Sequence, residues 1–157
     1  MTSRYFLSAL AICAAAGMAA TPLQAQEHVM LTPDEIEWQA GPASIPDGAE
    51  AVVLYGDPST EGPFALRLKL PEGYHIPPHT HPRPEIVTVI SGTFHLGTGE
   101  TAERSAAEAL PTGSFFAFDP GMAHFAYNDE ETVIQLNSVG PWSLDYVNPE
   151  DDPRGTQ

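Results

Sequence analysis

The sequence predicts an all-β fold in a single domain, an antiparallel sandwich or barrel. Short apolar runs recur along the chain, Gly, Pro, Asp and Asn separate them, and helical periodicity is rare. The chain has 157 residues, of which 42% are hydrophobic, and this matches one packed domain. The expected strands cover residues 51–55, 64–70, 85–91, 93–98, 114–118, 124–128, 132–139 and 143–147.

Residues 1–25 have the pattern of a secretory signal peptide. Arg4 supplies a positive charge, residues 5–20 form an apolar run rich in Ala, and small side chains precede a cleavage point after Ala25. A membrane anchor would need a longer and more apolar run. A lipoprotein beginning at Cys13 is disfavoured by the bulky Ile12 before it. We therefore expect a periplasmic or secreted protein whose mature chain has no cysteine, and thus no disulfide and no thiolate metal site.

Residues 26–48 are expected to form an irregular N-terminal arm with one short helical turn. Thr32 is a good N-cap, Pro33 suits the first helical position, and Glu35 completes a capping box. Turn sequences rich in Gly and Pro end the helix soon afterwards. The barrel domain is expected over residues 49–148, followed by a polar C-terminal tail at 149–157.

Hydrophobic periodicity separates two kinds of strand. In residues 64–70, apolar and polar or small side chains alternate, which predicts a strand with one buried face. Residues 86–90 and 115–118 are apolar on both faces, so another layer or a partner chain should cover them. A homodimer is one arrangement that would do so. Residues 102–109 form the helical candidate of this part of the chain.

The charge balance excludes some function classes. Six Lys and Arg stand against 21 Asp and Glu, for a formal net charge of −15. Such a chain repels phosphate backbones and anionic lipids, so we expect no nucleic-acid partner and, after signal cleavage, no membrane partner. A small-molecule ligand or substrate is the expected partner.

Four residues have the chemistry of a metal site. His79 and His81 are two apart, which on an extended strand puts both imidazoles on one face. Glu85 follows a rigid Pro-rich corner, and His124 follows a turn that would return a second hairpin alongside the first. Three imidazoles and a carboxylate suit a divalent transition metal such as iron, manganese, zinc, nickel or copper. If the ion is six-coordinate, two positions stay open. A solvated Pro-rich loop is the competing interpretation of His79 and His81 alone.

The spacing of these residues resembles the two motifs of the cupin superfamily. From Gly73, five residues lead to His79, one to His81, three to Glu85 and six to Gly92. In the second motif, seven residues separate Gly113 from Gly121, two precede His124 and three precede Asn128, after a gap of 20 residues between the motifs. One departure is that Asp119 stands where the family usually has proline. We expect this to alter the turn and leave the ligand in place.

The resemblance implies a small, single-domain (type-2) cupin. Its fold would be a double-stranded β-helix, a jelly-roll barrel with one metal in its mouth. The counterparts of the cupin ligands are His79, His81, Glu85 and His124.

Residues beside the motifs have less specific roles. Side chains two apart on a strand share a face, so if His124 faces inward, Ala126 and Asn128 lie on the same face. By the same alternation, the side chains at 87 and 89 face inward with Glu85. Arg67 would contact an anionic substrate if it faced the mouth, but a solvent-facing position is expected. His75 and His95 are expected at the surface, and Tyr74 and Trp142 in packing roles.

Three functions compete at this stage. The first is a metal-dependent enzyme acting on a small molecule, of dioxygenase, isomerase or lyase type, because a metal with open positions can act as Lewis acid or redox centre. The second is a non-catalytic periplasmic metal-binding or ligand-binding module, such as a carrier or sensor. The third is a structural dimer. Fold does not decide between them, and spacing places no further acid or base at the site, so the reaction type is not identified.

Overall fold

The computed structural model describes residues 28–155, so the signal peptide predicted at 1–25 lies outside the described residues. The strands are β1 (Gln39–Ala40), β2 (Glu50–Tyr55), β3 (Gly62–Leu70), β4 (His75–Thr80), β5 (Glu85–Ser91), β6 (Thr93–Thr98), β7 (Glu108–Pro111), β8 (Phe115–Phe118), β9 (His124–Tyr127), β10 (Thr132–Gly140) and β11 (Asp145–Tyr146). The helical segments are 3-10 turns: η1 (Pro33–Glu35), η2 (Arg104–Ala106), η3 (Pro149–Asp151) and η4 (Pro153–Gly155).

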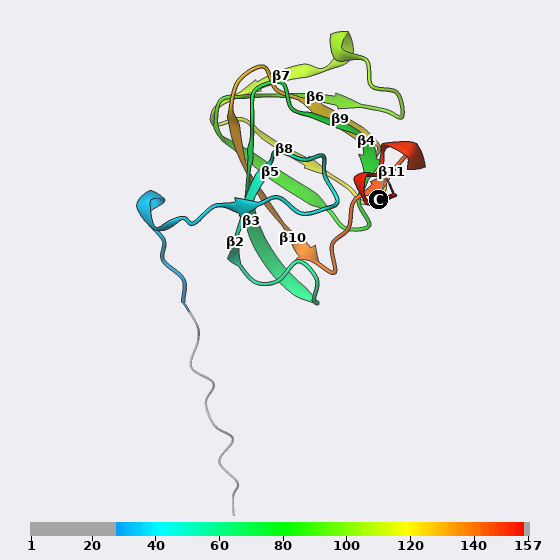
Figure 1. Cartoon of the computed structure of the whole chain (residues 1–157). Helices are drawn as coiled ribbons and strands as arrows, with labels where there is room; N and C mark the ends of the chain where they lie inside the picture. Colours follow the sequence, from blue (N-terminus) through cyan, green and yellow to red (C-terminus); the bar gives the residue numbers. More distant parts are fainter. Residues whose placement is uncertain (1–27, 156–157) are drawn as a thin grey trace, which may run out of the picture.

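The strands form two antiparallel sheets that face each other. Sheet A has the order β1-β2-β3-β10-β5-β8, and sheet B has the order β11-β4-β9-β6-β7 (Figure 1). This confirms the all-β jelly roll. In the part of the chain that the structure describes, the two sheets remain separate in their hydrogen bonding, so the expected barrel is a two-sheet sandwich.

The core lies between the sheets and follows the predicted alternation of apolar and polar side chains. On β3 and β10, Leu66 lies opposite Leu136 and Leu68 opposite Ile134, and all four belong to the core or pack against it. Val87 and Val89 of β5 are at most 1% exposed, which confirms that the side chains at these positions face inward. Because successive strand residues point to opposite faces, the residues between them face away from the core.

Two expectations about secondary structure were wrong. The helical candidate at 102–109 is one 3-10 turn, Arg104–Ala106, after which the chain continues directly into β7. Glu108 to Pro111 pair there with β6, so sheet pairing overrides the local preference for a helix. The strand β4 was not expected, because Pro77 and Pro78 lie inside it and proline cannot donate a ladder hydrogen bond.

The motif glycines occupy tight turns. Gly73, Gly92, Gly113 and Gly121 all have positive φ, between 76° and 88°. At Gly92 a Cβ would also lie 2.6 Å from the Glu131 carbonyl oxygen, so both the conformation and the space require glycine. The Gly121 N–H donates to the His81 carbonyl at 2.9 Å, which ties the second motif to the first.

The outer face of sheet A exposes apolar side chains, as the doubly apolar strands suggested. Ile86 and Ile90 of β5 are each 38% exposed, and Phe115 of β8 is 62% exposed. Within residues 28–155 no further layer covers these three side chains. The homodimer that would cover them stays a prediction.

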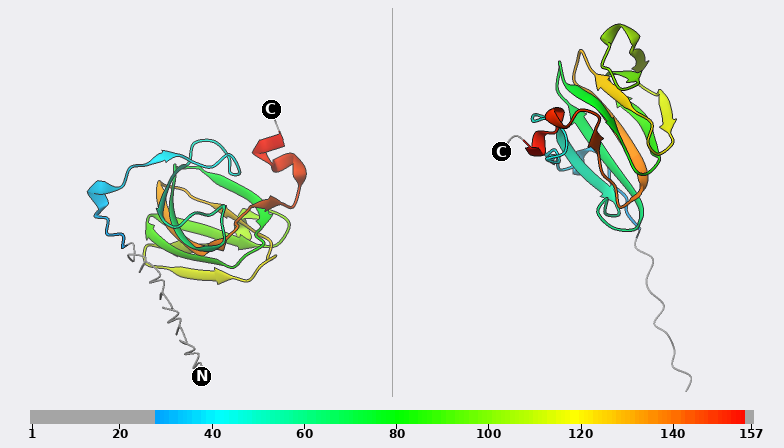
Figure 2. Two further views of the ribbon diagram at one scale, coloured as in Figure 1. Left: turned by 90° about the horizontal axis from the view of Figure 1, so that it is seen from below. Right: turned by 90° about the vertical axis from the view of Figure 1, so that its right-hand side faces the viewer.

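The N-terminal arm and the C-terminal turns lie near the same open end of the sandwich (Figure 2). Glu35 accepts hydrogen bonds from the Thr32 N–H and hydroxyl, at 2.7 and 2.8 Å, as the capping motif predicted. Farther along, Tyr146 donates its hydroxyl proton to the Ser44 carbonyl at 3.0 Å, which joins the arm to β11. Within residues 28–155, no helix is long and apolar enough to cross a membrane.

Candidate metal centre

Three of the four predicted ligands converge at one end of the space between the sheets. His79 lies on β4, His124 on the neighbouring strand β9, and His81 in the loop that follows β4. One nitrogen of each ring lies within 4.8 Å of the corresponding nitrogen of the others, and all three residues are buried. The structure thus brings together residues that are far apart in the sequence.

A β-bulge in β4 turns His79 toward this site. Ile76 is paired with Ala126 and His79 with His124, so β4 spans three positions where β9 spans two. The extra residue on β4 reverses the side-chain parity, as bulges do. His75 and His79 would lie on the same face of a regular strand, but here His75 faces outward against Tyr127 and His79 faces inward. The bulge contains Pro77 and Pro78, which lack the N–H that regular pairing would use.

Backbone carbonyls set the tautomer of each imidazole. His79 Nδ1 lies 2.7 Å from the Pro77 oxygen, His81 Nδ1 lies 2.8 Å from the Ser143 oxygen, and His124 Nδ1 lies 2.9 Å from the Met122 oxygen. A carbonyl only accepts hydrogen bonds, so each Nδ1 carries the proton. In the neutral imidazole, Nε2 then carries the lone pair, which is the arrangement that orients histidine ligands in metal sites.

Glu85 contributes a buried carboxylate from the start of β5, on the opposite sheet. Its Oε2 lies 3.0 Å from His124 Nε2, and its Oε1 lies 3.8 Å from His81 Nε2. Neither Glu85 Oε2 nor His81 Nε2 has a hydrogen-bond partner of suitable geometry. Buried polar atoms without partners are rare, and a cation between them would satisfy both. The donor set therefore fits a divalent metal ion.

Burial keeps two of the imidazoles neutral. It lowers the pKa of His79 to about 2, and charge on His124 or His81 would act in the same direction. Burial also lowers the pKa of His81, although the nearby Glu85 opposes the shift. For His124, burial acts to lower the pKa, but the adjacent Glu85 carboxylate outweighs it and the pKa is raised. A metal ligand must be the neutral imidazole, so the environment of His79 and His81 favours the binding form.

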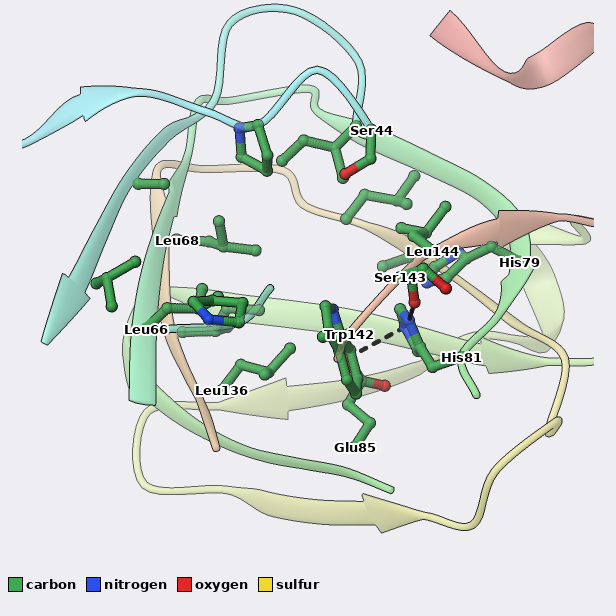
Figure 3. A pocket seen from close by; sticks show the side chains of 18 of the residues that line it. Ser44, Leu66, Leu68, His79, His81, Glu85, Leu136, Trp142, Ser143 and Leu144 are labelled. Atoms are coloured by element: carbon green, nitrogen blue, oxygen red, sulfur yellow. Dashed lines mark hydrogen bonds and ion pairs between the residues drawn. The ribbon is translucent and has the colours of Figure 1, made fainter. Parts of the chain in front are cut away.

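The ligand cluster opens into a cavity of about 600 Å³ between the sheets. Figure 3 shows His81 close to Trp142, with Leu66 and Leu68 at the other end of the cavity. The Trp142 indole stacks on the His81 ring, with centroids 4.1 Å apart and planes 21° apart. Trp142 also packs edge-on against Phe64, with centroids 5.8 Å apart.

The segment after β10 contributes to the site in a way that the sequence did not predict. Trp142 had been given a packing role, but it also lines the cavity, and the Ser143 carbonyl orients His81. Arg154, within the predicted polar tail, lines the cavity as well. These residues lie more than 60 positions from His81 along the chain, and no local pattern marks them.

Other candidates lie outside the cavity. Arg67 points to the outer face of sheet A, where its Nε donates to Gln135 Oε1 at 3.0 Å. His75 and His95 lie on the outer face of sheet B, and both are partly buried. Asn128 is 1% exposed, and its side-chain amide donates to the carbonyls of Pro71 and Glu130, at 2.5 and 2.8 Å. Ala126 lines the cavity as parity predicted, whereas Asn128 has a structural role.

Comparison with known proteins identifies the family. Residues 14–145 match the family described as a domain of unknown function (DUF4437). The fold is similar to that of an RmlC-like cupin from Shewanella frigidimarina, with a TM-score of 0.56 and 16% identity over 73% of this chain and 91% of that one. The chain belongs to the DUF4437 family, and its fold is that of a cupin.

Curated relatives of this chain include plant germin-like proteins. Germin-like protein subfamily 2 member 1 of Arabidopsis thaliana is 37% identical over 90 residues, which are 57% of this chain and 41% of that protein. Germin-like protein 8-2 of Oryza sativa subsp. japonica is 44% identical over 80 residues, which are 46% of this chain and 36% of that protein. The chain thus spans about two-fifths of the length of these relatives.

Solved structures with a similar fold include two enzymes. An acetylacetone dioxygenase from Acinetobacter johnsonii has a TM-score of 0.62 and 17% identity over 87% of each chain. The polyketide cyclase RemF from Streptomyces resistomycificus has a TM-score of 0.64 and 12% identity, over 81% of this chain and 90% of that one. At such identities these likenesses show the fold alone.

Proposed function

We propose that this protein is an exported, metal-dependent cupin enzyme that acts on a small molecule. One observation carries the proposal: three buried imidazoles direct their Nε2 atoms to one point, and each is held by a backbone carbonyl at Nδ1. Structural histidines have no need of such convergence. The dioxygenase and cyclase with the same fold support an enzymatic role.

In this proposal His79, His81, Glu85 and His124 hold one divalent transition metal. When bound, the ion would supply Lewis-acid or redox chemistry next to the cavity. Glu85 adds the negative charge that offsets the ion in a buried site, and its unpartnered Oε2 faces the imidazoles. The set contains only nitrogen and oxygen donors, which suits iron, manganese, nickel, copper and zinc.

The surrounding side chains would orient the ligands and exclude water. Trp142 covers one face of the His81 ring and restricts its rotation. Phe118 lies against His124 with ring centroids 5.1 Å apart. Apart from the four ligands, Arg154 is the one ionisable side chain among the described residues that line the cavity. Proton transfer would therefore depend on the ligand residues, on Arg154 or on the substrate itself.

Metal content is the first test. The full chain would be expressed with its leader, purified without a His-tag or chelator, and examined by inductively coupled plasma mass spectrometry. We expect about one equivalent of a single metal, absent from a His81→Ala/His124→Ala double variant. If the double variant retains the metal, or if the wild type takes up none on reconstitution, the assignment is wrong.

Turnover is the second test. Metal-loaded and metal-stripped protein would each be incubated with a library of small molecules, and products followed by liquid chromatography and mass spectrometry. Metal-dependent product formation supports the enzyme. Stoichiometric binding of a library member without any product would contradict it in favour of a carrier or sensor.

Export is tested on the same preparation. The N-terminal sequence of protein recovered from the periplasm or medium should begin at Gln26. Recovery of the intact leader from the cytoplasm would contradict this part of the proposal.

A further inference from the structure

The cavity beside the ligand cluster extends well beyond the metal ligands. Its volume of about 600 Å³ is within the range of small-molecule sites, which is roughly 300–1,000 Å³. His79 and His81 stand at one end, and Leu66 and Leu68 stand at the other, with Leu136 and Trp142 between them (Figure 3). A ligand that contacts the histidines therefore places its remaining atoms against the other side chains that line the cavity.

The part of the cavity wall away from the histidines is mostly apolar, with Gln39, Ser44 and Ser59 as polar exceptions. It includes aliphatic and aromatic side chains from both sheets and the N-terminal arm: Ile45, Leu68, Ile76, Phe94, Ile134 and Leu136. All six are at most 8% exposed and belong to the core cluster. A charged group placed against them would lose its hydration without gaining a partner, which is strongly unfavourable.

The one cationic side chain among the described residues that line the cavity is already neutralised. Arg154 donates from Nε to Asp152 Oδ1 and from Nη2 to Asp152 Oδ2, each at 2.8 Å, and from Nη2 to the Leu144 carbonyl at 2.9 Å. This fork holds the guanidinium against a carboxylate of its own chain. An anionic ligand would have to compete with Asp152 for it, within a protein of formal net charge −15.

We infer that the site takes a small molecule whose body away from the histidines is uncharged and predominantly apolar. Its oxygen-bearing end lies at the histidines, and its apolar body lies between Leu66, Leu68 and Leu136. This inference rests on the proposed function, since it names the substrate class of the same site. It excludes molecules that carry a carboxylate or phosphate on the body away from the histidines, because the described side chains along that part of the wall offer no unpaired cation.

A matched pair of competitors tests the inference. Metal-loaded protein would be titrated with the neutral fluorescent probe N-phenyl-1-naphthylamine, which would then be displaced by 4-phenyl-2-butanone or by 4-(3-oxobutyl)benzoate. Both competitors carry a benzene ring and the same ketone, but only the second carries a carboxylate, on the side of the ring away from the ketone. We expect the uncharged ketone to bind at least about tenfold more tightly, a difference of roughly 1.4 kcal/mol. Equal or tighter binding of the carboxylate, or failure of the probe to bind, would overturn the inference.

Two substitutions of alanine by phenylalanine show where the probe binds. Ala51 lines the cavity, whereas Ala65 lies on the outer face of sheet A beside Arg67. We expect Ala51→Phe to weaken probe binding at least about fivefold by filling the cavity, and Ala65→Phe to leave it unchanged. Melting curves and metal content establish that each variant is folded. If Ala51→Phe does not fold, the competitor ratio of the wild type still decides. Equal loss in both folded variants would contradict the assignment.

Metal content separates this inference from the proposed function. Selective binding of the ketone by a protein that takes up no metal would support the substrate class and contradict the metal enzyme. Preference for the carboxylate by a metal-loaded protein with metal-dependent turnover would support the metal enzyme and contradict the substrate class.

Discussion

Sheet B carries two groups of histidines on its opposite faces, and they differ in what occupies their ring nitrogens. On the inner face and its adjoining loop, His79, His81 and His124 bind backbone carbonyls through Nδ1 and direct Nε2 to a common point. On the outer face, His75 stacks on Tyr127 with centroids 4.2 Å apart, and His95 Nε2 lies 3.4 Å from Asp129 Oδ2. The inner group is arranged for a metal, whereas the outer group is arranged for packing and a polar contact at the surface.

The comparison shows that the direction of the ring nitrogens, more than the presence of histidine, defines a site. His75 and His95 lie on either side of Tyr127, because both are paired with it across the sheet. Arg104 lies over the Tyr127 ring, 5.1 Å from its centroid, and forms an ion pair with Asp129. The carboxylate on the outer face, Asp129, is therefore already paired with an arginine, whereas Glu85 on the inner face has no lysine or arginine as a partner among the described residues.

The largest expected difference between the faces is in metal affinity. His124→Ala should weaken metal binding by at least about 100-fold, because one of three convergent imidazoles is lost. His95→Ala should leave the affinity within about twofold, since its imidazole faces the opposite side of the sheet. Competition titration with a chelator of known affinity measures both. Equal losses would remove the distinction between the two groups.

A smaller effect is expected at the end of β9, the strand that carries both His124 and Tyr127. Asn128→Ala should lower the free energy of unfolding by about 2–3 kcal/mol, because the carbonyls of Pro71 and Glu130 lose their buried donor. Urea denaturation of metal-free protein measures this. Asn137→Ala, on the partly exposed face of β10, is the matched control and should cost less than about 0.5 kcal/mol. A similar cost for both would show that the Asn128 amide is dispensable.

Close packing on the outer face of sheet B can be tested at Gly97. A Cβ there would lie 2.1 Å from the Phe125 ring, and Phe125 is fully buried. Gly97→Ala should therefore cost about 1–3 kcal/mol of stability through overpacking. Relief of most of this cost in the Gly97→Ala/Phe125→Leu double variant would confirm the contact. A stability equal to that of the wild type in the single variant would show that the outer face is loosely packed.

The smallest expected effect concerns pH and the outer face. Burial lowers the pKa of His75, with Asp151 opposing the shift and Arg104 adding to it. The unfolded chain therefore binds a proton more readily than the folded protein as the pH falls below the ordinary histidine value. Between pH 7 and pH 5, metal-free wild type should lose more stability than metal-free His75→Gln. Equal losses in urea titrations at the two pH values would contradict this.

Local patterns account for most strands and for the ligand residues. The alternation at 64–70 became β3, and the spacing of His79, His81, Glu85 and His124 identified four residues that the fold brings together. The motif glycines were also informative, since a positive φ is a local requirement. That these four residues hold a metal stays a prediction until metal is measured.

Other features of the fold and of the site depended on contacts between distant parts of the chain. Pairing of β4 with β9 overrode the proline content of β4 and created the bulge that aims His79 inward. The residues at 102–109 were predicted as a helix, but β6 offered hydrogen bonds to Glu108 and its neighbours. Neither the bulge in β4 nor the strand β7 can be derived from the secondary-structure propensities of its own residues, because the stabilising partner strand lies elsewhere in the sequence.

By itself, the sequence determined the all-β class, most of the strands and the identity of the four candidate ligands, because periodicity, turn chemistry and motif spacing are local properties. Only the tertiary structure decided the tautomer of each imidazole, the stacking of Trp142 on His81 and the neutralisation of Arg154 at an apolar cavity. Each of these depends on which groups come within a few ångströms of one another, and the packing of the two sheets, together with the segments at their open end, sets those distances.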